Sequence, residues 1–149
     1  MASRRKGRIL AFQALYSWDL HYSSPRKAPV PEELLEFSWA GSASSSESSS
    51  SLKEETRIFS ALIVSGTIEN ISLIDKEIQK HLRGWEIDRI NRVDLAILRM
   101  SVYTLLFQKE IAPSIIIDEA IGISKEFGTD DSYRFINGVL DNVRKSFAE

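Results

Sequence analysis

Residues 3–20 read SRRKGRILAFQALYSWDL. The spacing of apolar residues in this stretch is typical of a helix. At 100° per residue, the apolar side chains cover most of the circumference of that helix; they are Ile9, Leu10, Ala11, Phe12, Ala14, Leu15 and Trp18. A helix that is apolar on so many sides lies inside a bundle. We therefore expect a first helix from about Ser3 to Leu20, with Ser3 as its N-cap.

The same stretch begins with a cluster of four cations: Arg4, Arg5, Lys6 and Arg8. Residues 1–8 contain no acid, while the remainder of the chain carries 15 cations against 21 acids, a net charge of −6. Because buried, unpaired cations are prohibitively costly, we expect these four to project out of the core. Nucleic-acid phosphate is the usual partner of such a cluster. The alternative is a solvated, flexible N-terminus.

The rest of the chain shows helical spacing nearly everywhere. The expected helices are a short one at 31–39, a long one from Leu52 to Leu82, one from about Asp88 to Phe107, one at Pro113 with Ser114 as N-cap and Gly128 as C′ residue, and a last one from Thr129 or Asp130. The glycine of RGW, residues 83–85, is expected to stop the long helix. No stretch alternates convincingly as a strand. The sequence predicts a single all-α domain, a helical bundle, over residues 1–149.

The middle of the chain contains a serine-rich segment, SASSSESSSS at residues 42–51. It has too little apolar surface to offset its ordering entropy, so we expect a mobile loop at about 40–51. The alternative is that this segment is phosphorylated or binds a partner. The long helix that follows carries one apolar stripe, formed by Val64, Ile68, Ile71, Ile74, Ile78 and Leu82. The last helix has a similar stripe of Ile136, Val139, Leu140, Val143 and Phe147.

Signals of catalysis are missing from the sequence. There is no cysteine, and the two histidines, His21 and His81, lack the spacing of metal ligands. The glycines form no phosphate-binding loop, and no nucleophile stands at readable spacing from a base. We expect a protein that is not an enzyme and holds no metal or cofactor. With no secretory signal and no apolar run near 18 residues, we expect it in the cytoplasm, away from membranes.

Three blocks resemble the NusB family of bacterial transcription antitermination factors: RRKGRILAFQALYSW, RVDLAILRMSVYTL, and IDEAIGISKEFG followed by DSYRFINGVLDNV. The resemblance covers residues 3–20 and 86–147. It implies two small helical subdomains packed together. It also implies binding to the boxA element of nascent ribosomal RNA as a heterodimer with the ribosomal protein NusE, in a complex with RNA polymerase and other Nus factors. Some members of the family form homodimers, and the sequence leaves that open.

This resemblance gives the basic cluster a use, since its cations can neutralise the backbone of single-stranded RNA. Gln13 offers an amide donor and acceptor to a base edge. Tyr16 lies near the same side as Phe12 and Arg5, so its ring can stack on a splayed base. The alternatives are a solvated position for Gln13 and a core ring for Tyr16.

The resemblance adds candidates in the second half of the chain. Asp94 matches a position tied to partner and RNA binding, and we assign it with Arg99 to partner binding. The alternative is that Asp94 pairs inside the protein with a cation such as Arg99 or Arg92, because a buried carboxylate needs one. The remaining RNA-binding candidates are Phe127, Asp131 and Phe135.

Each of these has a plainer interpretation as well. Phe127 can be a core residue, and Asp131 a helix N-terminal acid. Two other functions stay open for the whole chain. One is another role in ribosomal RNA maturation, as in the ribosomal RNA methyltransferases that carry a NusB-like segment. The other is a helical adaptor that binds only protein.

Overall fold

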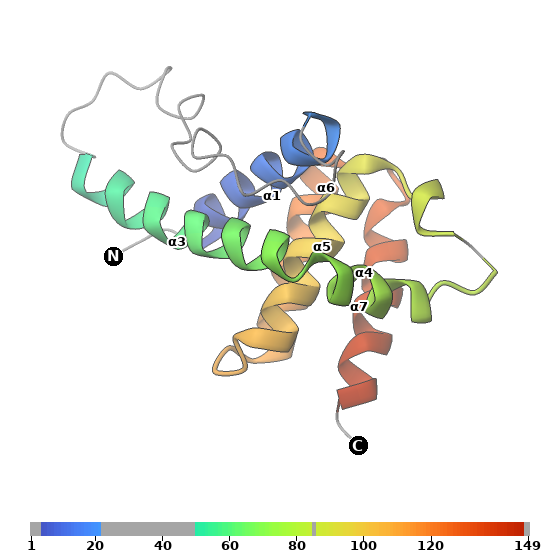
Figure 1. The fold of residues 1–149 in the computed structure, drawn as a ribbon. Coiled ribbons are helices and arrows are strands. Elements are labelled where there is room, and N and C mark those ends of the chain that lie inside the picture. Colours follow the sequence, from blue (N-terminus) through green and yellow to red (C-terminus); the bar gives the residue numbers. More distant parts are fainter. Residues whose placement is uncertain (1–3, 22–49, 85, 148–149) are drawn as a thin grey trace. The chain divides into compact units, whose positions relative to one another are not determined.

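The computed structural model describes residues 4–21, 50–84 and 86–147. In these ranges the chain is helical and contains no strand, which confirms the all-α prediction (Figure 1). The backbone contacts group into two compact units, Met1–Glu69 and Asn70–Glu149. The expected N-cap Ser3, the expected helix at 31–39 and residues 40–49 of the serine-rich segment lie outside the described residues. Ser50 and Ser51, assigned to the loop, are already helical.

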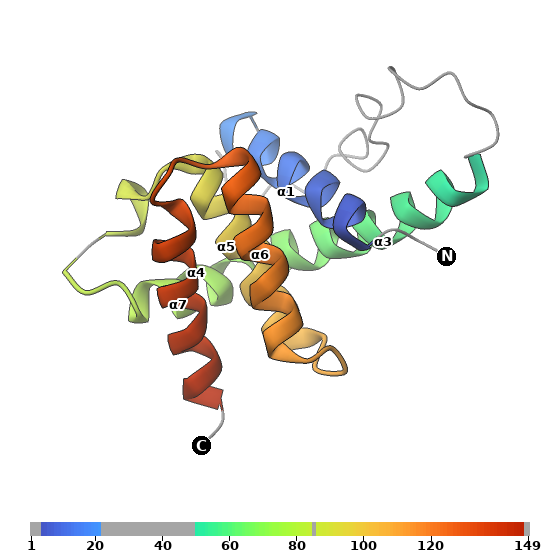
Figure 2. The ribbon, with the colours of Figure 1, turned by 180° about the vertical axis from the view of Figure 1, so that it is seen from behind.

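The described part of the first unit consists of α1 (Arg4–His21) packed along α3 (Ser50–Glu69) (Figure 2). Gly7 lets the two helices approach closely, because a side chain at this position would overlap the ring of Phe59. At the same point the Ser60 hydroxyl donates a hydrogen bond of 2.7 Å to the Gly7 carbonyl oxygen. The buried apolar residues confirm the packed first helix; they are Leu10, Ala11, Phe12, Ala14, Leu15 and Trp18 from α1 with Ile63, Val64 and Ile68 from α3.

The long helix expected over Leu52–Leu82 is wrong, since α3 ends at Glu69 and α4 spans Ile71–Lys80. The backbone leaves helical geometry at Asn70, with φ −112° and ψ 24°. The apolar stripe continues through this break into the second unit. Ile68 is buried in the first unit, and Ile74 and Ile78 are buried in the second.

The second unit is built around α5 (Arg92–Phe107), in which every residue from Asp94 to Leu105 is buried. It packs against α4, α6 (Pro113–Phe127) and α7 (Ser132–Phe147). The helix begins at Arg92 rather than Asp88, because Ile87–Arg89 form a separate 3₁₀ turn, η3. The Asn91 side chain caps α5 by accepting a hydrogen bond of 2.9 Å from the backbone N–H of Asp94.

The residues that end α4 and α6, and the N-cap of α6, differ in position or in role from those expected. Gly84 has a positive φ of 76°, but α4 has already ended at Lys80. Gly128 ends α6 with extended backbone, and a Cβ there would clash with Ser132, so close packing explains this glycine. The N-cap of α6 is Ala112 with Pro113 in the first turn, not Ser114.

The start of the last helix is close to the prediction. The first regular turn of α7 begins at Ser132, and the Ser132 hydroxyl accepts a hydrogen bond of 2.9 Å from the Thr129 N–H. The stripe on α7 is buried at Ile136, Val139, Leu140 and Val143. The side chain of Phe147 is outside the described set.

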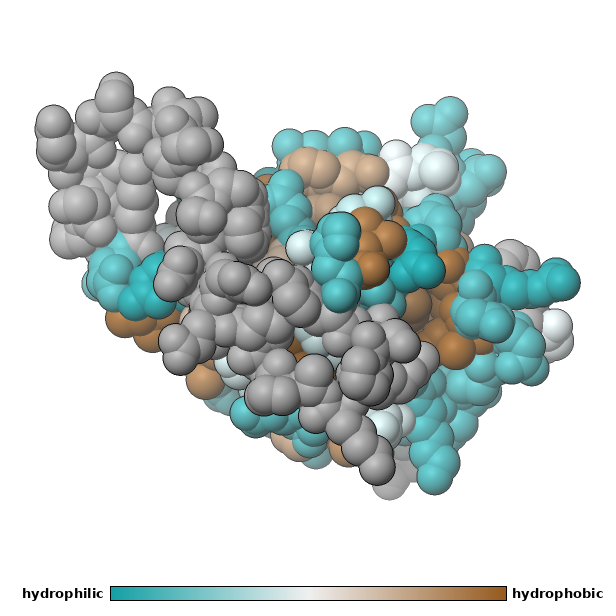
Figure 3. All heavy atoms as spheres, turned by 45° about the horizontal axis from the view of Figure 1, so that its top comes forward, coloured by the Kyte–Doolittle hydropathy of each residue, from teal (hydrophilic) through white to brown (hydrophobic). Residues whose placement is uncertain are grey.

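Exposed large apolar side chains are spread over both units rather than gathered at one place; examples are Ile58 and Leu62 on α3, and Phe107 and Ile115 in the second unit. Figure 3 shows apolar patches separated by hydrophilic residues on one face. No single helix in the described ranges is long and apolar enough to cross a membrane; α3 and α4 together pass by length and composition, but they are broken at Asn70.

Candidate nucleic-acid interface

The basic cluster at the start of α1 is split by the packing of the first unit. Arg4, Arg5 and Lys6 are exposed in the first turn of the helix, as expected. Arg8 is only 2% exposed, so the expectation that it projects from the core is wrong. Its guanidinium carbon lies 5.5 Å from the centroid of the Phe59 ring, in cation–π geometry. The aromatic face offers the cation a favourable site beside the close approach at Gly7.

Three further side chains of α1 continue the exposed cations along one side. Ile9, Gln13 and Tyr16 are all partly exposed, whereas their neighbour Phe12 is buried. At 100° per residue, Arg5 and Tyr16 differ by only about 20° around the helix, and Gln13 lies about 80° from Arg5 and about 60° from Tyr16. This side therefore presents cations, an amide and an aromatic ring in succession. The alternatives for Gln13 and Tyr16 stay open, because both side chains are only partly exposed.

A second group of aromatic and charged residues lies where α6 gives way to α7. Phe127 is 36% exposed, which a plain core residue would not be. Asp131 is exposed in the turn between the helices, and Phe135 is partly exposed in α7. The three second-half RNA candidates thus come from one short region of the second unit.

The structure adds a cation–aromatic cluster to this region that the sequence analysis missed. Lys125 Nζ lies 4.9 Å and Arg134 Cζ 5.6 Å from the centroid of the Tyr133 ring. Arg134 Nε also donates a hydrogen bond of 3.1 Å to the Tyr133 hydroxyl, and this bond raises the pKa of Arg134. Adjacent Tyr133 and Arg134 were a visible signal in FGTDDSYRF, but Lys125 comes from a different helix.

The two partner-binding candidates do not pair with each other. Arg99 is 4% exposed and binds Asp75 through two hydrogen bonds, Nε to Oδ1 at 2.9 Å and Nη2 to Oδ2 at 2.8 Å. The alternative pairing of Asp94 with Arg99 is therefore wrong. Five residues apart on α5, the two side chains differ by about 140° around the helix, too far to meet.

Asp94 is itself buried, with 6% exposure, at the start of α5. This burial raises the pKa of the Asp94 carboxyl above its usual range, and the Ser132 hydroxyl opposes the shift by hydrogen bonding. Among the described residues, its Oδ1 atom has no hydrogen-bond partner. A buried acceptor in this state is costly, which makes Asp94 a place where an added donor would be favourable.

No metal site is formed by the described residues, since no three His, Asp or Glu side chains converge there. His21 is exposed in the last turn of α1. His81 follows α4, with its Nε2 atom 3.6 Å from Glu77 Oε2. Both histidines thus stand at helix ends, as expected.

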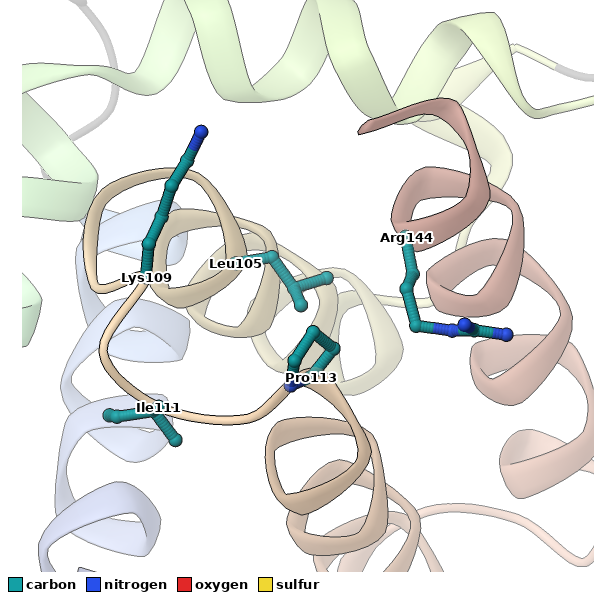
Figure 4. A pocket seen from close by; sticks show the side chains of 5 residues that line it. All are labelled: Leu105, Lys109, Ile111, Pro113 and Arg144. Atoms are coloured by element: carbon teal, nitrogen blue, oxygen red, sulfur yellow. The ribbon is translucent and has the colours of Figure 1, made fainter. Parts of the chain in front are cut away.

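A small hollow lies where α5 turns into α6 (Figure 4). Leu105 and Pro113 form its apolar part, while Lys109 and Arg144 stand at opposite sides. Arg144 is held by Asp141, to which its Nε donates a hydrogen bond of 3.2 Å. The hollow thus has one cation, Arg144, paired with a carboxylate of its own helix.

Solved structures share this fold, and two of them illustrate the match. T. maritima NusB matches with a TM-score of 0.78 and 32% identity, over 97% of this chain and 93% of that one. A chain in the crystal structure of antitermination factors NusB and NusE in complex with double-stranded RNA matches with a TM-score of 0.76 and 26% identity, over 96% of both chains. The fold thus defines the class, that of the helical antitermination factors.

The sequence comparisons give the family. The sequence model of the NusB family matches residues 5–145. Transcription antitermination protein NusB of Treponema denticola is 51% identical over 142 residues, 95% of each chain. The corresponding protein of Geobacter sulfurreducens is 40% identical over 149 residues, covering 100% of this chain and 99% of that protein. The chain belongs to the NusB family, which confirms the resemblance.

Proposed function

We propose that this protein is a transcription antitermination factor that binds boxA-type single-stranded RNA of nascent ribosomal RNA together with the ribosomal protein NusE. The observation that carries the proposal is the exposed first turn of α1, Arg4, Arg5 and Lys6, which is followed on the side of Arg5 by partly exposed Gln13 and Tyr16. The names of the relatives and the solved NusB–NusE–RNA complex support it. Nascent transcripts are made in the bacterial cytoplasm, so the activity belongs there.

Each α1 residue has a distinct task in this proposal. The three exposed cations neutralise phosphates, and arginine adds two-pronged hydrogen bonding. Gln13 addresses a base edge, and Tyr16 stacks on a base. Arg8, as a buried neighbour of Phe59, holds the start of α1 against α3 and so supports the cluster without projecting into it.

The second unit contributes stacking and selectivity. Phe127 and Phe135 provide partly exposed rings for unpaired bases. The carboxylate of Asp131 repels phosphate, which disfavours wrong placements of the backbone. Partly exposed aromatic rings suit single strands better than paired RNA, whose bases are stacked inside the helix.

For NusE binding we retain Asp94 and Arg99 as the proposed residues, with different tasks. The Oδ1 atom of Asp94 would accept a hydrogen bond from the partner. Arg99, bound to Asp75, would act by holding α5 against α4 and so keeping Asp94 in place. RNA polymerase and the other Nus factors would join through the assembled complex.

The test is a binding measurement with a boxA oligonucleotide, a scrambled one and a boxA duplex, each with and without NusE. With three phosphate contacts, log affinity for the single strand should fall against log salt with a slope of about −2. The variant R4A/R5A/K6A should flatten this slope. The variant K76A/R89A removes exposed cations elsewhere and serves as control. Unchanged boxA binding by the triple variant would refute the proposal.

A further inference from the structure

A second basic surface lies in the second unit, between the end of α4 and one side of α7. Two adjoining hollows there share His81, Arg83 and Asn142 and so form one groove. One hollow also contains Lys80 and Lys145, and the other contains Arg134. None of the residues that line either hollow is acidic. In a chain whose charge is negative beyond its first residues, a groove lined in this way is a local positive field.

The four cations of the groove are exposed and therefore accessible to a ligand. Arg134 interacts with the Tyr133 hydroxyl and with the charge of Asp131, both at the surface. Lys80 Nζ lies 3.2 Å from Glu77 Oε1, and Lys145 Nζ lies 3.1 Å from Asp141 Oδ2. Each pair lies within a single helix, the first in α4 and the second in α7, and the two lysine side chains are 62% and 64% exposed. The Lys145–Asp141 pair is solvent-accessible on both partners and therefore weak, so a phosphate can compete for its ammonium group. The Lys80 ammonium is also accessible, although its partner Glu77 is only 10% exposed.

Gly138 lines the groove and places no side chain in it. It stands in the interior of α7, where glycine is among the least favourable residues. A Cβ at this position would meet nothing within 4 Å, so the packing of the chain does not require a glycine. Arg134, Gly138 and Asn142 follow one another at four-residue steps on one side of α7. From Arg134 to Lys145 this side is about 16 Å long.

We propose that this groove binds the sugar–phosphate backbone of RNA as a continuation of the path over Phe135. The inference rests on the proposed function, because Phe135 is both a proposed stacking residue and part of the groove wall. Arg83, Arg134, Lys80 and Lys145 supply the charge, and the Asn142 amide can bond to phosphate or to a 2′-hydroxyl. The missing side chain of Gly138 lets the backbone of the strand approach the helix.

The experiment compares R83A/K145A with K76A/R89A, which removes one lysine and one arginine outside the groove. Binding of the full chain to boxA RNA with flanking nucleotides is followed by fluorescence anisotropy from 50 to 300 mM salt. Loss of two phosphate contacts should make the salt slope shallower by about 1.4 and weaken binding about tenfold at low salt. The control should bind as the wild type does.

A second variant, G138L, adds a side chain to the groove at a position where the Cβ meets nothing within 4 Å. We expect weaker RNA binding with no fall in melting temperature. Wild-type affinity and slope for R83A/K145A, or wild-type binding by G138L, would overturn the groove while leaving the α1 interface standing. Loss of NusE binding with RNA binding intact would also overturn it, because the groove would then hold protein. Failure of the wild type to bind boxA RNA would remove the proposed function and the groove together.

Discussion

Gly7→Ala should destabilise the protein even though alanine is the better helix residue. The added methyl group overlaps the Phe59 ring and lies 3.3 Å from the Ser60 hydroxyl oxygen. Overpacking of this kind costs about 1–3 kcal/mol, while the gain in helix preference is about 1 kcal/mol. The difference is a net loss of up to about 2 kcal/mol in the free energy of unfolding. The measurement is urea denaturation of the full chain, followed by circular dichroism.

The effect of Gly7→Ala on the free energy of unfolding should change sign when the Phe59 ring is removed. In a Phe59→Ala background, Gly7→Ala no longer meets the ring and should stabilise the protein by up to about 1 kcal/mol. Gly138→Ala is the matched control, since its Cβ has open space, and it should also be stabilising. If Gly7→Ala were as stabilising in the wild-type background as Gly138→Ala, close packing at Phe59 would not explain this glycine.

Three further changes test other parts of the structure. Asp75→Ala leaves the guanidinium of Arg99 buried without its carboxylate, and urea denaturation should show a loss of about 3 kcal/mol; a loss under about 1 kcal/mol would contradict the buried pair. Burial raises the pKa of Asp94 in the folded state, so the folded protein holds this proton more tightly than the unfolded chain does. Wild-type stability therefore falls as pH rises through the folded-state pKa. Asp94→Asn should therefore stabilise more at pH 7 than at pH 4, and an equal effect on the urea midpoint at both would exclude a raised pKa. Tyr16→Ala should weaken boxA binding by about 1–3 kcal/mol if the ring stacks on a base, with Tyr16→Phe near the wild type.

The cation clusters show that the local sequence pattern does not predict which cations are buried or which residues they contact. Arg4, Arg5, Lys6 and Arg8 are equivalent in sequence, yet Arg8 alone of the four is buried. Its position follows from the face that α1 turns toward Phe59, at a contact where Gly7 and Ser60 are 53 residues apart. In the same way, Tyr133 and Arg134 are neighbours in the chain, but Lys125 joins them only because α6 packs against α7.

The sequence by itself determined the helical class of the fold, most helix positions and the basic start of α1, because these depend on neighbours three or four residues away. Only the folded structure shows that the long helix breaks at Asn70, because the apolar stripe continues on both sides of that residue and gives no sign of the break. It also decided that Arg99 binds Asp75, 24 residues distant, and leaves Asp94 to another donor. The groove between α4 and α7 is also visible only in the folded structure, because its cations come together only when the helices pack.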